Sequence, residues 1–242
     1  MRKIIIFSYD GSKFYGLQRQ NKLRSVQKEI EDALTKVFCE EIVIKASGRT
    51  DAGVHAINQV AHFDCYTEIK DLKKKLNEIL MPDIVVKKVK NVCNDFHARK
   101  SVEKKEYIYK INLGEYEPTQ NNYVYQYNKS LNLDYIKEAL PLLKGTHNFK
   151  AFTKIDEEKE NYIRTIYEIN MTLNNNILTF EFVGNGFLRY MVRNIVGTLI
   201  NVGEGKIEPQ EIAKIIESCD RKKAGLKAPA CGLYLNNVYY SK

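Results

Sequence analysis

Strand-like segments alternate with amphipathic helical segments along the whole chain, and this order limits the fold more than any other feature of the sequence. Apolar residues recur at every second position in the strand-like segments and at helical spacing in the helical segments. The alternation predicts an α+β fold. Strands are expected at 3–9, 59–64, 83–89, 107–111, 163–173, 177–183 and 232–240, and helices at 25–37, 69–79, 134–143, 187–202 and after Pro209.

The same rhythm occurs twice, which predicts two similar halves. We place them at residues 1–105 and 106–242, with no low-complexity linker between them. Pro141 conflicts with the helix expected at 134–143, because proline removes an internal hydrogen bond, so a kink or an early stop is expected there.

The helix expected at 187–202 is the longest and has a polar side. Its apolar arc includes Met191, Ile195 and Leu199, and Arg193 falls at the seam between the two sides. The side chains expected opposite the arc are Tyr190, Asn194, Thr198 and Asn201.

Composition narrows the class of protein. The 242 residues are 44% hydrophobic and 28% charged, which is typical of a soluble globular chain. No apolar run approaches the roughly 20 residues that cross a bilayer, and no signal peptide is evident, so a cytoplasmic protein without a membrane partner is expected. The five cysteines have neither zinc-site nor disulfide spacing, and the net charge of +8 favours a polyanionic partner such as nucleic acid.

The densest cluster of chemically versatile residues is the segment Gly-Arg-Thr-Asp-Ala-Gly-Val-His at 48–55. Two glycines on either side of a carboxylate and a guanidinium allow the backbone to approach a ligand closely. An equally valid interpretation of this segment alone is a turn in which Asp51 bonds its own backbone.

The segment 48–56 resembles the characteristic motif of the TruA family of tRNA pseudouridine synthases. Further segments resemble the family in the same order, and they span residues 4–240. Departures are Leu17, where the family commonly has Trp, and Val102, where it commonly has Ala. The matching segments are Tyr9-Asp10-Gly11-Ser12 with Gly16 and Gln18-Arg19-Gln20, Phe96-His97-Ala98-Arg99, Tyr107-x-Tyr109, Gly184-Asn185-Gly186-Phe187, and 191–197.

The resemblance implies roles for four residues. Asp51 would be the catalytic acid, Arg193 would pair with its carboxylate, Tyr107 would pack against the target base, and Arg49 would assist extrusion of the uridine. A neighbouring guanidinium favours the ionised carboxylate. From the residues alone, Arg193 could be a solvated helix residue, Tyr107 an inward-facing strand residue and Arg49 a surface charge.

The resemblance also implies the substrate and the assembly. It points to two related halves that share a mostly antiparallel mixed sheet, with helices on one side and a central basic cleft, and to a homodimer. The substrate would be tRNA, at uridines 38 to 40 of the anticodon stem-loop. The isomerisation would need no metal, nucleotide or other cofactor.

The basic residues suggest a groove for the RNA backbone, although each alone is an ordinary surface charge. The residues considered for this groove are Lys13, Arg19, Arg24, Arg99, Lys100, Lys104 and Lys105.

Two other functions are alternatives for this sequence. A metal-dependent phosphohydrolase or nuclease would use carboxylate and imidazole ligands. A non-catalytic RNA-binding module would have lost Asp51 or Arg193, and both are present. The candidate metal ligands are Asp51, His55, His62, Asp64 and His97.

Overall fold

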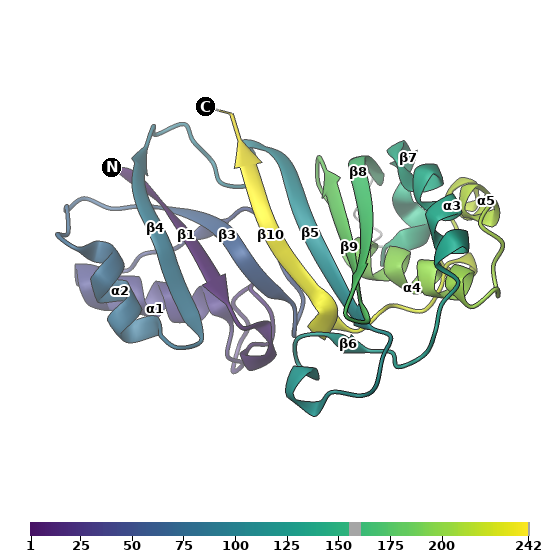
Figure 1. Ribbon diagram of the computed structural model, residues 1–242. Helices are drawn as coiled ribbons and strands as arrows, with labels where there is room; N and C mark the ends of the chain where they lie inside the picture. Colours follow the sequence, from purple (N-terminus) through teal and green to yellow (C-terminus); the bar gives the residue numbers. More distant parts are fainter. Residues whose placement is uncertain (155–160, 242) are drawn as a thin grey trace. The chain divides into compact units, whose positions relative to one another are not determined.

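The computed structural model describes residues 1–154 and 161–241. The chain divides into two compact units: unit 1 contains residues 1–103 and 234–242, and unit 2 contains residues 104–233. The last strand therefore belongs to the same unit as the first hundred residues (Figure 1). Both units are α+β, as predicted.

Unit 1 is a sheet covered on one face by two helices (Figure 1). The strand order is β4-β1-β3-β10, with β2 also paired to β3, and only the β3–β10 pair is parallel. The elements are β1 (Arg2–Tyr9), β2 (Lys45–Ala46), β3 (His55–Asp64), β4 (Ile84–Val92), β10 (Leu233–Tyr240), α1 (Val26–Phe38) and α2 (Leu72–Leu80).

The core of unit 1 lies between this sheet and its helices. Ile5 and Phe7 on β1 are fully buried, as are Ile30 and Leu34 on α1. Ser25, the first residue of the helix expected at 25–37, is the N-cap of α1, although its side chain makes no cap hydrogen bond.

Unit 2 contains an antiparallel ladder of strands, β5-β9-β8-β7, in which a short parallel strand, β6, pairs with β5. Helices α3, α4 and α5 pack together beside it (Figure 1). The elements are β5 (Val102–Asn112), β6 (Tyr125–Gln126), β7 (Gly145–Asn148), β8 (Ile163–Asn174), β9 (Ile177–Gly184), α3 (Leu133–Leu143), α4 (Met191–Gly203) and α5 (Glu211–Ser218).

Two helix predictions for unit 2 need correction. Helix α3 continues through Pro141 to Leu143, because the proline lies in the last turn, where little helix remains to be disrupted. Helix α4 begins at Met191 and not at residue 187, because Tyr190 has a left-handed backbone conformation with φ 66°. Left-handed conformation is incompatible with an α-helix interior.

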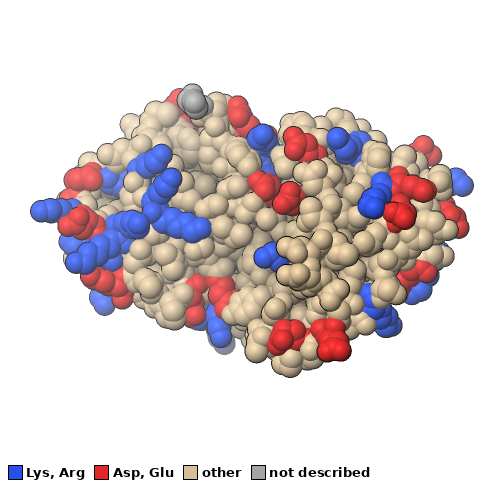
Figure 2. Space-filling model, in the orientation of Figure 1, with Lys and Arg blue, Asp and Glu red and all other residues tan. Residues whose placement is uncertain are grey.

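Charge is unevenly distributed over the surface. Figure 2 shows lysine and arginine side chains gathered over β1 and β4 of unit 1, on the face that lies away from α1 and α2. In the part of the chain that the structure describes, no helix is long and apolar enough to cross a membrane.

Candidate functional site

The segment 48–54 forms a loop between β2 and β3 of unit 1, which we call the Asp51 loop. Asp51 is half-buried, and its carbonyl accepts a hydrogen bond of 3.1 Å from the Val54 amide. The neighbouring carbonyl of Thr50 accepts from the Leu17 amide at 3.2 Å, so the backbone on both sides of Asp51 is fixed. Leu17 is almost fully buried and contributes to the packing.

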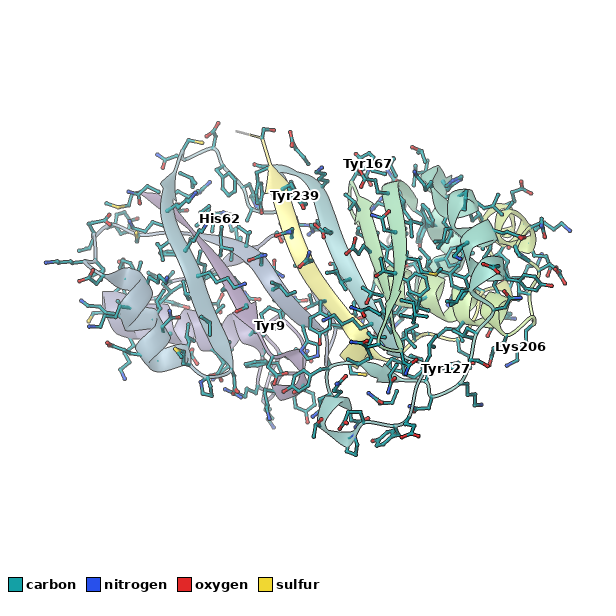
Figure 3. The ribbon with its side chains drawn as sticks, in the orientation of Figure 1. Tyr9, His62, Tyr127, Tyr167, Lys206 and Tyr239 are labelled. Carbon is teal, nitrogen blue, oxygen red and sulfur yellow. The ribbon has the colours of Figure 1, made fainter. Side chains whose placement is uncertain are left out.

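A buried hydroxyl pair ties the Asp51 loop to the sheet. Tyr9 lies at the end of β1 (Figure 3). Its Oη lies 2.7 Å from the Oγ1 of Thr50. Burial raises the pKa of Tyr9 to about 12, although its hydrogen bonds to Thr50 and Gln59 act in the opposite direction. Tyr9 therefore stays neutral at physiological pH and can keep this hydrogen bond.

Two glycines allow the segment after β1 to press directly against the Asp51 loop. A Cβ atom on Gly11 would lie 2.1 Å from the carbonyl oxygen of Val54, and one on Gly16 would lie 2.9 Å from that of Thr50. Gly16 also has a φ of +94°, a conformation that favours glycine. The glycines at 11 and 16, noted in the sequence without a role, thus shape the loop.

His55 follows the loop and is held on three sides. Its Nδ1 accepts a hydrogen bond of 3.0 Å from the Gly11 amide and lies 3.4 Å from a carboxylate oxygen of Asp10. Its ring stacks on that of Tyr234 with a centroid distance of 4.6 Å. His55 therefore supports the loop.

The candidate metal ligands do not gather into a ligand set. The Nδ1 of His62 accepts a hydrogen bond from Ala98, and that of His97 accepts one from Arg99. Among the residues that the structure describes, no three His, Cys, Asp or Glu side chains are arranged to hold a metal ion.

Arg49 is exposed on the Asp51 loop. Two other basic residues of unit 1 are occupied by acidic partners: Arg19 lies 3.0 Å from Glu31, and Arg24 lies 2.7 Å from Asp83. An arginine that is already ion-paired attracts a polyanion less strongly, so Arg19 and Arg24 are weaker candidates for the groove.

Tyr107 is a buried residue of β5 in unit 2. Its ring meets the edge of the Phe187 ring at a centroid distance of 5.1 Å and an angle of 78°, an edge-to-face contact. Phe187 lies in the loop before α4, so an aromatic pair connects this loop to the strand.

Arg193 is a buried residue in the first turn of α4. Its Nε donates a hydrogen bond of 2.7 Å to the carbonyl of Ala228, and its own carbonyl accepts one of 3.1 Å from the Ala228 amide. The guanidinium carbon also lies 5.7 Å from the ring centre of Tyr190. A buried guanidinium held in this manner has little rotational freedom.

The segment 220–229, which we call the strap, lies directly on α4. A Cβ atom on Gly197 would lie 1.7 Å from the carbonyl oxygen of Leu226, and one on Gly225 would lie 2.5 Å from that of Gly197. The two glycines therefore permit backbone-to-backbone contact. Tyr109 fixes the end of the strap by donating a hydrogen bond of 2.7 Å to the carbonyl of Pro229.

The strap covers the polar side of this helix. Asn194 and Thr198 are buried beneath the strap, and both side chains form hydrogen bonds with strap residues. The Oδ1 of Asn194 accepts from Arg221 at 2.9 Å, and the Oγ1 of Thr198 accepts from the Gly225 amide at 2.8 Å. Arg221 also donates to the carbonyls of Ala224 and Gly225.

The profile of a known family matches most of the chain. The tRNA pseudouridine synthase family matches residues 5–99 and 139–241, which include the Asp51 loop, α4 and the strap. The chain belongs to the tRNA pseudouridine synthase family. Members of this family are isomerases that form pseudouridine from uridine in tRNA, and this protein is an isomerase of that kind.

Relatives of the family are similar over nearly their full length. The chain is 45% identical over 238 residues to tRNA pseudouridine synthase A 1 of Bacillus cereus, covering 97% of this chain and 96% of that protein. It is 42% identical over 243 residues to tRNA pseudouridine synthase A of Thermosipho africanus, covering 99% of each.

One solved structure, a Cbf5-Nop10-Gar1 complex, matches with 11% identity and a TM-score of 0.38, over 98% of this chain and 58% of that one. This likeness is too distant to carry an argument about the protein.

The structure thus places the four predicted site residues in two groups. Arg49 and Asp51 lie on one loop of unit 1, and Tyr107 and Arg193 lie in unit 2. The pairing of Asp51 with Arg193 remains a prediction.

Proposed function

We propose that the protein isomerises uridines 38 to 40 in the anticodon stem-loop of tRNA, with the carboxylate of Asp51 acting on the target nucleotide. The observation that carries this proposal is the fixed backbone around Asp51, inside a segment that the tRNA pseudouridine synthase family matches. A catalytic group held by its surroundings reacts without first being ordered.

The reaction rearranges one nucleotide. The bond between the ribose C1′ and the uracil N1 breaks, the base turns, and a bond forms between C1′ and C5. A proton leaves C5 and one is taken up at N1, so the atoms balance without an oxidant or a reductant. Asp51 acts by attack on C1′, by attack on C6 or by removal of a sugar proton, and each of these routes uses the ionised carboxylate.

Arg193 provides the positive charge that keeps Asp51 ionised in this proposal. Its support is the buried position of the guanidinium and its hydrogen bond to Ala228. An adjacent guanidinium stabilises a carboxylate and opposes the effect of burial.

Arg49 and Tyr107 act on the base in this proposal. The uridine must leave the stack at a cost of a few kcal/mol, and the exposed guanidinium of Arg49 would assist this step. Stacking of the base on the ring of Tyr107 would stabilise the everted nucleotide by roughly 1–3 kcal/mol. Tyr107→Phe should retain this contact and Tyr107→Leu should lose it. Full turnover in both variants would remove Tyr107 from the site.

The proposal is tested by tritium release from tRNA labelled at C5 of uridine. Asp51→Asn should bind tRNA with wild-type affinity and release no tritium. Asp32→Asn, which neutralises an exposed carboxylate on α1, should remain fully active. Undiminished release by Asp51→Asn or Asp51→Ala would refute the proposal.

Mapping of pseudouridines in the tRNA tests which uridines the protein modifies. Unmodified tRNA incubated with the protein should gain pseudouridine at positions 38 to 40, and modification elsewhere alone would contradict this specificity. The homodimer and the cytoplasmic location belong to the same proposal, and light scattering of the purified protein tests the dimer.

A further inference from the structure

The register of the strands in unit 1 places a row of four residues, with a lysine at each end, on the sheet face opposite α1 and α2. Phe38 of α1 contacts Phe63, with ring centres 5.9 Å apart, so Phe63 faces the helices. Its neighbour His62 therefore faces the other way, because successive residues of a strand alternate between faces. Directly paired with His62 are Lys45 on β2 and Ile4 on β1, and Ile4 is in turn paired with Lys90 on β4.

The loop after β4 folds onto this face. The Ala98 amide donates a hydrogen bond of 3.1 Å to the Nδ1 of His62, and the rings of His62 and His97 lie 4.7 Å apart. Arg2 donates a hydrogen bond of 2.8 Å to the carbonyl of Phe96, which holds the loop in place. The loop thus brings His97 and the exposed Lys100 to the row that contains Lys45.

The hydrogen bonds of His97 determine its tautomer. Its Nδ1 accepts from the amides of Arg99 and Lys100 at 3.1 and 3.4 Å, so the ring proton must be on Nε2. A neutral imidazole with this tautomer presents an N–H donor at Nε2.

Three cations act on the ring of His97. Burial lowers the pKa of His97, and the positive charges of Lys100, Lys45 and Arg2 lower it further. Arg2 is already engaged by Asp64, with contacts of 2.8 Å from two guanidinium nitrogens. Lys45 and Lys100 are thus the two cations that act on this neutral N–H donor besides the ion-paired Arg2.

We infer that Lys45, Lys100 and the Nε2–H of His97 bind a phosphodiester group of the RNA substrate. Two ammonium groups and a neutral donor suit the charge and the acceptor oxygens of a phosphate. The inference rests on the proposed function, since it assigns a second contact to the same RNA. The positive patch over β1 and β4 supplies the surrounding attraction (Figure 2).

The phosphate contact is remote from the reacting nucleotide. His62 lies seven residues beyond His55 on β3, and a strand rises about 3.4 Å per residue, so the contact is roughly 24 Å along the strand from the end of the Asp51 loop. Such a contact positions RNA without taking part in the chemistry, and it should affect binding rather than turnover.

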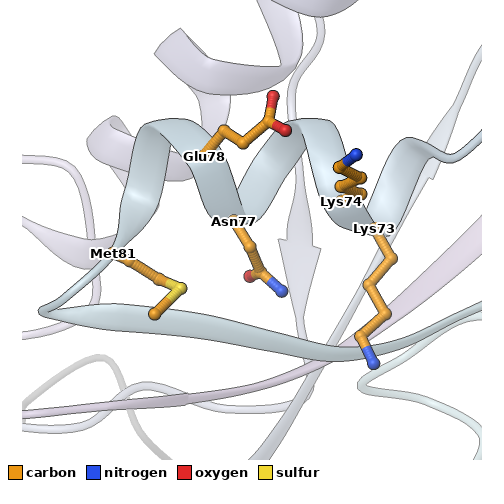
Figure 4. A pocket seen from close by; sticks show the side chains of 5 residues that line it. All are labelled: Lys73, Lys74, Asn77, Glu78 and Met81. Atoms are coloured by element: carbon orange, nitrogen blue, oxygen red, sulfur yellow. The ribbon is translucent and has the colours of Figure 1, made fainter.

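The test compares two double variants that remove equal charge from opposite faces of unit 1. Lys45→Ala/Lys100→Ala removes the two ammonium groups, and Lys36→Ala/Lys74→Ala removes two exposed lysines from α1 and α2 (Figure 4). Binding of unmodified tRNA is measured from low to high salt, together with KM and kcat for tritium release.

The first double variant should bind tRNA roughly tenfold more weakly, with a salt dependence smaller by about one ion. Its KM should rise and its kcat should stay at the wild-type value. The control should match the wild type, and Lys45→Arg/Lys100→Arg should restore affinity because it keeps both charges. Equal effects of the two alanine variants, or a loss of kcat without a change in affinity, would overturn the inference.

The outcome is distinguishable from failure of the proposed function. If wild-type protein neither binds tRNA nor releases tritium, the proposed function itself is wrong. If it does both and the two alanine variants behave alike, only the phosphate contact is wrong.

Discussion

Arg193 and Ala228 exchange two hydrogen bonds, one from the Nε of the arginine and one to its backbone carbonyl. Lysine has no donor equivalent to Nε, so Arg193→Lys keeps the charge and loses the attachment. A hydrogen bond to a charged group contributes about 1.5–3 kcal/mol. We expect at least a tenfold loss of kcat in tritium release, with tRNA affinity unchanged. Wild-type kcat in this variant would show that the attachment is dispensable.

Because the backbones of α4 and the strap are in contact, we expect substitution of Gly197 to destabilise the protein. Gly197→Ala would place a Cβ atom 1.7 Å from the carbonyl of Leu226, so the strap must move. Overpacking of this kind costs roughly 1–3 kcal/mol, which urea unfolding can measure. Gly186→Ala is the control, because its Cβ would meet nothing closer than 3.8 Å. Equal stability of both variants would contradict the packing described.

The hydroxyl pair of Tyr9 and Thr50 predicts a coupled loss of stability. Tyr9→Phe leaves the buried Thr50 hydroxyl without this partner, at a cost of about 1–3 kcal/mol. Thr50→Val should cost a similar amount, and the double variant should cost less than the sum of the single losses. A double-mutant cycle of unfolding free energies measures this coupling, and strictly additive losses would show that the two residues do not interact.

We expect protonation of His62 to lower the stability of the fold in mild acid. Burial lowers its pKa from 6.5 to about 4, with a smaller contribution from His97 and Arg2. The neutral ring accepts from Ala98, so the stabilisation is complete above pH 6.5 and is lost as the pH falls towards 4. Between pH 8 and pH 5 the loss is about 2 kcal/mol. His62→Gln should remove this part of the pH dependence of unfolding, and an unchanged pH profile would contradict it.

The sequence predicted the elements whose residues interact locally. Residue alternation located β1, and helical spacing with a serine N-cap located α1. The helix expected after Pro209 is α5, and it buries Ile212, Ile215 and Ile216. These elements depend on neighbours within a few positions, so the pattern contains the necessary information.

The features that the sequence did not predict are contacts between residues far apart in the chain. The spacing placed Asn194 and Thr198 opposite the apolar arc but could not show what covers them, because their strap partners lie 27 residues further along the chain. The Tyr9–Thr50 pair joins residues 41 positions apart. Residue identities located the Asp51 loop, but no local pattern could predict which hydroxyl would hold it.

The parallel pairing of β10 with β3, at Tyr234 with His55 and Leu235 with Ala56, has a consequence for biosynthesis. Translation proceeds from the N-terminus, so the ribosome makes the Asp51 loop long before the strand that completes its sheet. Unit 1 reaches its final form only after release of nearly the whole polypeptide, whereas all of unit 2 has by then been synthesised. The nascent chain therefore completes the unit that carries the Asp51 loop last.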